Sequence, residues 1–546
     1  MTRPAHDCML KDFEDHSFRV KLHEAVHNKT LPPSYDDHPV VTSSDELVVP
    51  VGIYMDSLPY SLVDSVLGVW LINYITGARH ILMLIRKRSV CACGCRGWCT
   101  YHNILVWINW CAEILAAGIH PSSRHDGEPF LEFHDEARID LAGAAMRFKC
   151  AVIKLKGDWQ EFAERLGFPT WQSGTRPCFC CNGFGSLLYS PIGVSFSSAL
   201  PWDLNTDEDY HTACQRCEIW IIIPNADDLG RIVQALHYDK RKTGNRGRCL
   251  KRSFLEFSLD EGDRLEPHSG LMDIAEFDAI TTFPAQALFW RRSNETLCTH
   301  RSPLFNYRIG ITPTKSIAID ALHTLFLGPM LVWGKLALWC LLLAGIWGTF
   351  ESNNEERLRV AIMAMRAALM HWYSQEQAQG RFHTRIDYMT SKMIGTQSKQ
   401  ALKLKAMEAY GFIQFLVHCL LTYPSPNTHA LRAAGQLLIQ FVQIMKDSHG
   451  RLTVAEQHRM LSMWKQYMAI MRPYESDTPK AHLAYHMILR TPVHGNPWMD
   501  HTFLDESLNK QLKQCCRMSH QVTFEQSVIC KLQEILNRLM HKRGLH

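Results

Sequence analysis

Val48–Asp56 reads VVPVGIYMD, a short apolar run that ends on a carboxylate, and Phe148–Asp158 reads FKCAVIKLKGD and ends in the same way. Runs of four to eight β-rich apolar residues closed by a polar turn fit a buried strand better than a helix. Ligands bind at the carboxyl-terminal edge of the strands in open α/β sheets. Two carboxylates at that edge repel each other unless a cation neutralises them, so Asp56 and Asp158 predict a hard divalent metal site.

The composition is that of a globular protein. The chain has 546 residues, of which 46% are hydrophobic and 21% charged, and the length allows about three or four domains. The formal net charge of +4 does not by itself imply a nucleic-acid partner. The N-terminus lacks the apolar core of a secretory signal, so we expect the 19 cysteines to be metal ligands or buried thiols in a reducing compartment.

The sequence between the two acids predicts three strands, a helix and a fourth strand. The predicted strands are residues 51–56, 65–74, 79–90 and 148–156, and the predicted helix is 101–117. This order, with acids closing the first and fourth strands, is that of an RNase H-like core, an α/β fold with a mixed sheet flanked by helices. Residues 1–47 are polar, and we expect an irregular N-terminal arm there.

The chain beyond residue 319 has a helical pattern. Apolar residues recur three and four apart in residues 355–373, 399–421, 428–445 and 453–471. Thr453 and Glu456 supply a capping box for the last of these helices, and Gly450 fits a stop for the one before. This pattern predicts an all-α insertion.

The apolar stretch at residues 331–348 is long enough to raise a membrane span. Lys335 interrupts it, and a single span so late in the chain would be an odd topology. We therefore favour a buried core helix, with a membrane anchor as the alternative.

Cysteines cluster in two regions. The first, CACGCRGWC, could hold zinc or form a turn of buried thiols, and its members are Cys91, Cys93, Cys95 and Cys99. The second region has two CxxC pairs, which are Cys178 with Cys181 and Cys214 with Cys217. Four thiolates on two such turns can hold a structural zinc. The gap between the pairs is longer than in common zinc ribbons, so His211 or Cys249 could replace one ligand.

Two further patterns concern binding. Residues 240–252 contain no acid and seven basic residues. The basic residues are Lys240, Arg241, Lys242, Arg246, Arg248, Lys251 and Arg252. Such a run is usually a solvated face, but beside a phosphoryl-transfer site it would contact a phosphate backbone. His482 and His486 have the i, i+4 spacing of zinc ligands on a helix. They lack the Glu of HExxH, and we do not predict a metal there.

Cleavage or joining of a phosphodiester by two metal ions normally needs a third carboxylate, because the ions must be held about 3.5–4 Å apart. Periodicity does not locate that residue. Four segments, however, resemble the CACTA superfamily of cut-and-paste DNA transposases, which belong to the DDE/D class and have an RNase H-like fold. The segments are PVGIYMDSLPYS, IKLKGDWQEFAERLGFPTW with the following PCFCC, IDALHTLFLG, and WMDHTFLDESLNKQLK.

The resemblance implies that Asp56, Asp158 and Glu506 are the three acidic metal ligands. Asp505 is a rival third acid, and Glu506 can also be interpreted as a solvated acid that suits a helix start. Asp320 and His323 match a DxxH element that would brace the active-site edge, with a core histidine as the alternative. The resemblance also implies catalytic Mg²⁺ or Mn²⁺, transposon-end DNA as partner and a nuclear location. It implies no small-molecule cofactor and leaves a homo-oligomer open.

We therefore predict metal-dependent DNA strand cleavage and strand transfer. The alternative is a zinc-stabilised nucleic-acid-binding protein derived from a transposase that has lost catalysis. No DNA-binding module is visible before Val48. The expected parts are an irregular arm at 1–47, the first part of the core at 48–170, a cysteine-rich, basic insertion at 171–310, the DxxH segment and apolar helix at 311–350, a helical insertion at 351–475 and a C-terminal helical part carrying Glu506 at 476–546.

Overall fold

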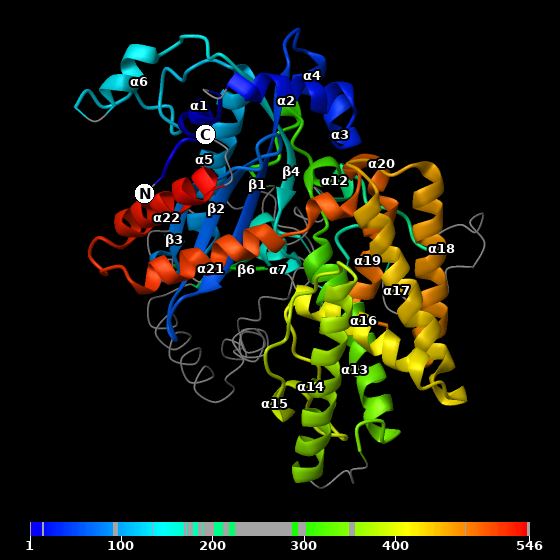
Figure 1. The fold of residues 1–546 in the computed structure, drawn as a ribbon. Helices are drawn as coiled ribbons and strands as arrows, with labels where there is room; N and C mark the ends of the chain where they lie inside the picture. The colour runs from blue at the N-terminus through cyan, green and yellow to red at the C-terminus, as the bar shows by residue number, and fades with distance from the viewer. Residues whose placement is uncertain are drawn as a thin grey trace, which may run out of the picture.

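A mixed α/β protein is seen in the computed structural model, with a four-stranded sheet and a largely helical C-terminal half (Figure 1). The structure describes residues 2–13, 16–90, 97–133, 135–168, 171, 178–183, 188, 201–210, 218–223, 287–292, 302–348, 355–474 and 477–542. The helices from α13 (Pro329–Leu343) to α19 (Pro479–Leu489) form a block beside the sheet, while α21 (Phe503–Arg517) and α22 (Phe524–Lys542) cross one face of the sheet (Figure 1).

The sheet has the order β3-β2-β1-β4. Its strands are β1 Val48–Pro59, β2 Ser65–Asn73, β3 Arg79–Arg86 and β4 Lys149–Lys156. Strands β1, β2 and β3 are antiparallel neighbours, whereas β4 pairs with β1 in parallel. A parallel pair needs a crossover, which contains α5 (Trp98–Ala117); this helix ends at Gly118, whose φ of 67° suits glycine. The predicted order of three strands, a helix and a fourth strand is confirmed.

Both faces of the sheet are covered. Ile53 and Met55 of β1 belong to the main core, which includes residues of α1 and α5. Tyr54 points to the other face and shares a second core with Leu512 of α21 (Phe503–Arg517) and residues of α22 (Phe524–Lys542). Since successive side chains of a strand alternate between faces, burial on both sides explains why the strands read as nearly continuous apolar runs.

The prediction of an irregular arm at residues 1–47 is wrong. The segment forms α1 (Ala5–Phe13), α2 (His16–His27), α3 (Pro33–Asp36) and α4 (Pro39–Thr42). Met9, Phe18 and Leu22 are fully or almost fully buried in the main core, so tertiary packing stabilises helices that a polar composition concealed.

The C-terminal half is helical, as predicted. Its main helices are α12 Pro313–Ser316, α13 Pro329–Leu343, α14 Glu355–Ala378, α16 Ala406–Thr422, α17 His429–Asp447, α18 Val454–Met471, α19 Pro479–Leu489 and α20 Thr491–His494. The predicted capping box of Thr453 and Glu456 is confirmed. Gly450 does not end the preceding helix, which stops at Asp447. It is needed because the backbone of Thr30 packs directly against it: a Cβ on residue 450 would lie 1.6 Å from the carbonyl oxygen of Thr30.

Shorter elements connect these units. They are η1 Lys87–Ser89, α6 Glu136–Leu141, α7 Trp159–Glu161, η2 Phe162–Leu166, η4 Tyr307–Ile309, η5 Leu322–Phe326, α15 Ser391–Ile394, η6 Pro426–Thr428, η7 Arg472–Tyr474 and η8 Pro497–Asp500. Strands β5 (Glu218–Ile223) and β6 (Ala287–Arg292) form a separate antiparallel pair.

The apolar helix α13 lies against α16 and α17. The helical segment Leu322–Leu343 is long and apolar enough to cross a membrane, and 67% of its 18-residue apolar window is buried within the protein. Trp333 and Leu338 of α13 are fully buried. Length and composition of this kind are shared by membrane spans and by core helices of soluble proteins.

Candidate functional site

Three acidic side chains come from separate elements to one edge of the sheet. Asp56 lies near the carboxyl end of β1, and Asp158 follows the parallel strand β4. Asp158 caps α7, because its Oδ1 accepts a hydrogen bond of 2.7 Å from the backbone N–H of Glu161. Glu506 lies in the first turn of α21. The charges of Asp158 and Glu506 both act on Asp56, so the structure brings the three predicted acids into one electrostatic cluster.

Asp56 has an environment that disfavours its negative charge. Burial raises its pKa, as do the charges of Glu161, Glu506 and Asp158, and the result is a pKa of about 8. The Tyr54 hydroxyl donates to Asp56 Oδ2 over 3.0 Å and the Asn509 amide donates to the same oxygen over 2.5 Å. These donors hold the carboxyl group in place. A cation at this edge would relieve the repulsion and favour the ionised form.

Asp505 and Glu506 are adjacent in α21 but differ in surroundings. The Asp505 side chain is fully buried and accepts from Lys156 Nζ at 2.8 Å and Arg79 Nε at 3.0 Å. Its burial would raise its pKa, but these two cations lower it. Glu506 is 39% exposed, and its Oε1 lies 3.6 Å from His323 Nε2. Asp505 is therefore a structural counter-ion, and Glu506 is the one that faces the other acids.

Asp320 and His323 connect this edge to the start of α21. Asp320 Oδ2 accepts from His323 Nδ1 over 2.5 Å and from the Thr502 hydroxyl over 2.8 Å, and its Oδ1 accepts from the Thr502 backbone N–H. Burial would lower the pKa of His323, but the Asp320 hydrogen bond and nearby carboxylates raise it to about 9. His323 is therefore a cation at neutral pH, directed at Glu506 by Asp320.

Three residues of this edge were not singled out in the sequence. Glu161 is buried and pairs with Arg165 at 3.2 Å, and its charge contributes to the raised pKa of Asp56. Asn509 holds Asp56. Lys480, at the start of α19, donates a hydrogen bond to the carbonyl oxygen of Leu327. The negative charges of Asp158 and Asp320 interact favourably with its ammonium group. Glu161 and Asn509 each lie three residues after a predicted acid, which is the helical spacing that could have indicated them.

A second buried ion pair fixes the C-terminal segment to β4. Lys154 Nζ is hydrogen-bonded to Asp500 and also donates to the His494 carbonyl over 2.8 Å. Both ionic side chains are almost completely buried. Together with the pair of Lys156 and Asp505, this contact sets where α21 begins relative to the sheet.

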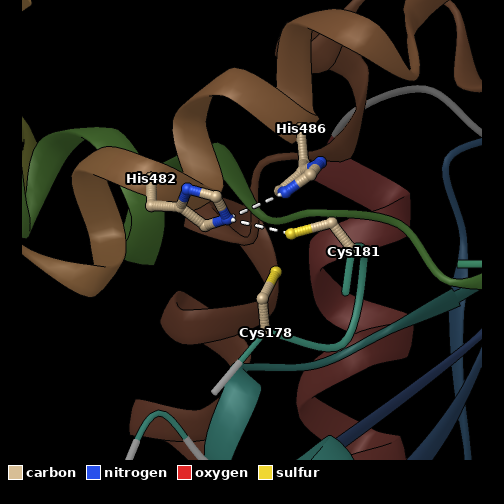
Figure 2. Close-up of side chains that lie close together, drawn as sticks. All are labelled: Cys178, Cys181, His482 and His486. Carbon is tan, nitrogen blue, oxygen red and sulfur yellow. Dashed lines mark hydrogen bonds between the residues drawn. The ribbon is translucent and has the colours of Figure 1, made fainter. Parts of the chain in front are cut away.

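Cys178, Cys181, His482 and His486 converge in the interior (Figure 2). All four are buried, and their ligand atoms lie within 4.8 Å of one another. Within the part of the chain that the structure describes, no other group of three or more Cys, His, Asp or Glu side chains meets this criterion. Such a group of two thiols and two imidazoles could hold a metal such as zinc.

The ligand atoms of this Cys2His2 group face one another. His482 Nε2 lies 3.4 Å from Cys181 Sγ and 3.0 Å from His486 Nε2. Burial lowers the pKa of His482 to about 4 and holds that of His486 well below its usual value, so both imidazoles are neutral. The structure thus gives the first CxxC pair two histidine neighbours on α19, where we predicted no metal.

Other predicted site residues lie outside the described residues. These are Cys91, Cys93, Cys95, Cys214 and Cys217, the substitutes His211 and Cys249, and the basic residues of 240–252. Cys99 lies in the first turn of α5. Whether Cys214 and Cys217 bind zinc stays a prediction.

Comparisons with protein-family models, with curated proteins and with solved structures gave no match.

Proposed function

We propose that the protein is a DNA transposase, or derives from one, and that it cleaves and joins DNA strands with Mg²⁺ or Mn²⁺. The observation that carries the proposal is the gathering of Asp56, Asp158 and Glu506 at one sheet edge while the neighbouring Asp505 is withdrawn into a buried ion pair. Carboxylate oxygens are the ligands that these hard cations prefer.

The strand order supports an RNase H-like core. Three antiparallel strands are followed by a helix and by a fourth strand parallel to the first, and acids stand at the ends of β1 and β4. The resemblance of four sequence segments to CACTA transposases adds the substrate class, which is DNA. Fold alone does not specify a reaction, so the acids and their neighbours carry the argument.

Asp56 and Glu506 suit a divalent cation, because burial and neighbouring carboxylates raise the pKa of both groups and a cation would favour their ionised forms. Metal ions held there would activate the attacking oxygen and stabilise the leaving one. Tyr54 and Asn509 fix the orientation of Asp56. Asp320 directs His323, and Lys480 places a second positive charge near Asp158, where a scissile phosphate would need one.

The test is cleavage of labelled DNA that carries the two ends of the transposable element, which flank the coding sequence. The assay contains Mn²⁺ or Mg²⁺. Wild type should release defined fragments, and Asp158→Asn should release none. Asp45→Asn, at an exposed acid just before the start of β1, is the control and should cut as wild type does. Equal cutting by wild type and Asp158→Asn would remove the proposal. Salt-sensitive DNA binding with no metal-dependent cutting by any variant would replace it with the non-catalytic nucleic-acid-binding function.

A further inference from the structure

The Cys2His2 group joins two segments that are far apart in sequence. Cys178 and Cys181 lie in the segment after β4 and η2, whereas His482 and His486 lie one turn apart on α19. Cys181 and His482 are separated by 301 positions. In Figure 2 the two thiols and the two imidazoles point at a common centre from these separate backbones.

The hydrogen bonds around the group orient one imidazole toward that centre. His482 Nδ1 lies 3.0 Å from the backbone carbonyl oxygen of Leu188, which only accepts, so Nδ1 carries the proton and Nε2 offers its lone pair. Metal-binding histidines are typically fixed in this way by an acceptor on the other ring nitrogen. The rings of His482 and His486 are also packed against Trp202, at centroid distances of 5.2 and 4.6 Å.

The spacing of the ligand atoms fits a tetrahedral ion. With zinc–nitrogen and zinc–sulfur bonds of about 2.0 and 2.3 Å, tetrahedral angles give nitrogen–nitrogen and nitrogen–sulfur separations of about 3.3 and 3.5 Å. The observed separations are 3.0 Å between the two Nε2 atoms and 3.4 Å between His482 Nε2 and Cys181 Sγ. A cation between them would let both imidazoles present lone pairs.

The cysteine turn has the geometry of a metal-binding turn. Cys178 Sγ accepts a hydrogen bond of 3.3 Å from the backbone N–H of Cys180, which would stabilise a thiolate. Cys180 itself does not belong to the Cys2His2 group, and its sulfur lies 3.7 Å from Arg490 Nη1. Cys178, Cys180 and Cys181 are all buried and none of them is in a disulfide, so Cys180 offers a control within the same turn.

We infer that Cys178, Cys181, His482 and His486 bind one Zn²⁺ as a closed structural site that fastens α19 to the segment following Asp158. Four protein ligands leave no open position, which is the arrangement of a structural rather than a catalytic zinc. The fastening also holds Lys480, two residues before His482, where the charges of Asp158 and Asp320 act on it. The zinc site does not depend on the proposed DNA cleavage, and it can be tested without it.

The experiment measures zinc per chain by inductively coupled plasma mass spectrometry on the purified full chain. Cys178→Ser and His486→Gln should each lower the zinc content by one equivalent relative to wild type, whereas Cys180→Ser should keep it. Because other cysteines can add zinc of their own, the difference between Cys178→Ser and Cys180→Ser is the quantity that decides. Equal zinc in these two variants would overturn the inference.

A second measurement uses wild type alone, in case the variants fold poorly. Titration of the thiols with an organomercurial should release at least one zinc per chain, detected with a chromogenic chelator, and Co²⁺ replacement should give the intense visible bands of a tetrahedral site with thiolate ligands. Peptide mass spectrometry showing a Cys178–Cys181 disulfide, or octahedral Co²⁺ bands only, would contradict the site.

Discussion

Replacement of Asp56 by Asn should stabilise the metal-free protein at alkaline pH. Each pKa unit corresponds to about 1.4 kcal/mol, so a rise from 3.8 to about 8 means that the ionised carboxylate costs the fold on the order of 6 kcal/mol. This cost already includes the hydrogen bond from Tyr54, which lowers the pKa of Asp56. A neutral amide avoids the cost, so we expect a gain on the order of 6 kcal/mol in the free energy of unfolding above pH 8.

The gain should depend on pH with a definite sign. The folded pKa of Asp56 lies above its unfolded value, so the stability of wild type is fully present below about pH 4 and is lost as the pH rises toward 8. The charges that face Asp56 are those of Asp158, Glu161 and Glu506, and they are common to both proteins. The difference between Asp56→Asn and wild type should therefore be near zero at pH 4 and largest above pH 8.

Urea unfolding of both proteins across this pH range measures the difference, with Asp45→Asn as an exposed control that should follow wild type. Addition of Mn²⁺ at pH 8 should then stabilise wild type but leave Asp56→Asn unchanged, because a ligand stabilises only the protein that binds it. A difference that is constant with pH, or a substitution that destabilises at pH 8, would refute the assigned environment of Asp56.

Three other predictions concern the acids at the start of α21, a buried ion pair and the packing of α17. Glu506→Gln should weaken Mn²⁺ binding at least tenfold with little change in melting temperature. Asp505→Asn should instead lower the free energy of unfolding by about 3–5 kcal/mol, because it leaves buried cations without their partner. A larger loss of stability in Glu506→Gln than in Asp505→Asn, measured by calorimetry, would contradict this assignment. Lys154→Met should destabilise by a similar amount, roughly 3–5 kcal/mol, and adding Asp500→Leu should restore most of it; a double variant no better than the single one would refute the pairing. Gly435→Ala should cost about 1–3 kcal/mol in chemical denaturation, because its Cβ would lie 2.2 Å from a buried tryptophan ring, and an unchanged midpoint would contradict that close packing.

The sheet could be predicted from the sequence because its information is local. The strands ending near Asp56 and Asp158 are short β-rich apolar runs with polar turns, and their parallel pairing follows from the helix between them. The N-terminal helices could not be predicted in this way, because Phe18 and Leu22 gain their stability from the core that they cover. Their few apolar residues are spread through polar sequence.

The candidate site shows the same division. The paired acids are visible in the sequence, but the choice between Asp505 and Glu506 is not, since neighbouring helical residues point about 100° apart and Lys156 and Arg79 decide which one is buried. The histidine neighbours of the CxxC turn at Cys178 could not be predicted from the sequence either. Sequence spacing favoured the next CxxC pair, whereas the folded chain brings a helix from three hundred positions away.

Anomalous diffraction from crystals soaked in MnCl₂ tests the proposed metal site directly. We expect two Mn²⁺ peaks about 3.5–4 Å apart, contacted by carboxylate oxygens of Asp56, Asp158 and Glu506. Mn²⁺ peaks elsewhere, with none among these three acids, would contradict the proposed metal-dependent cleavage of DNA.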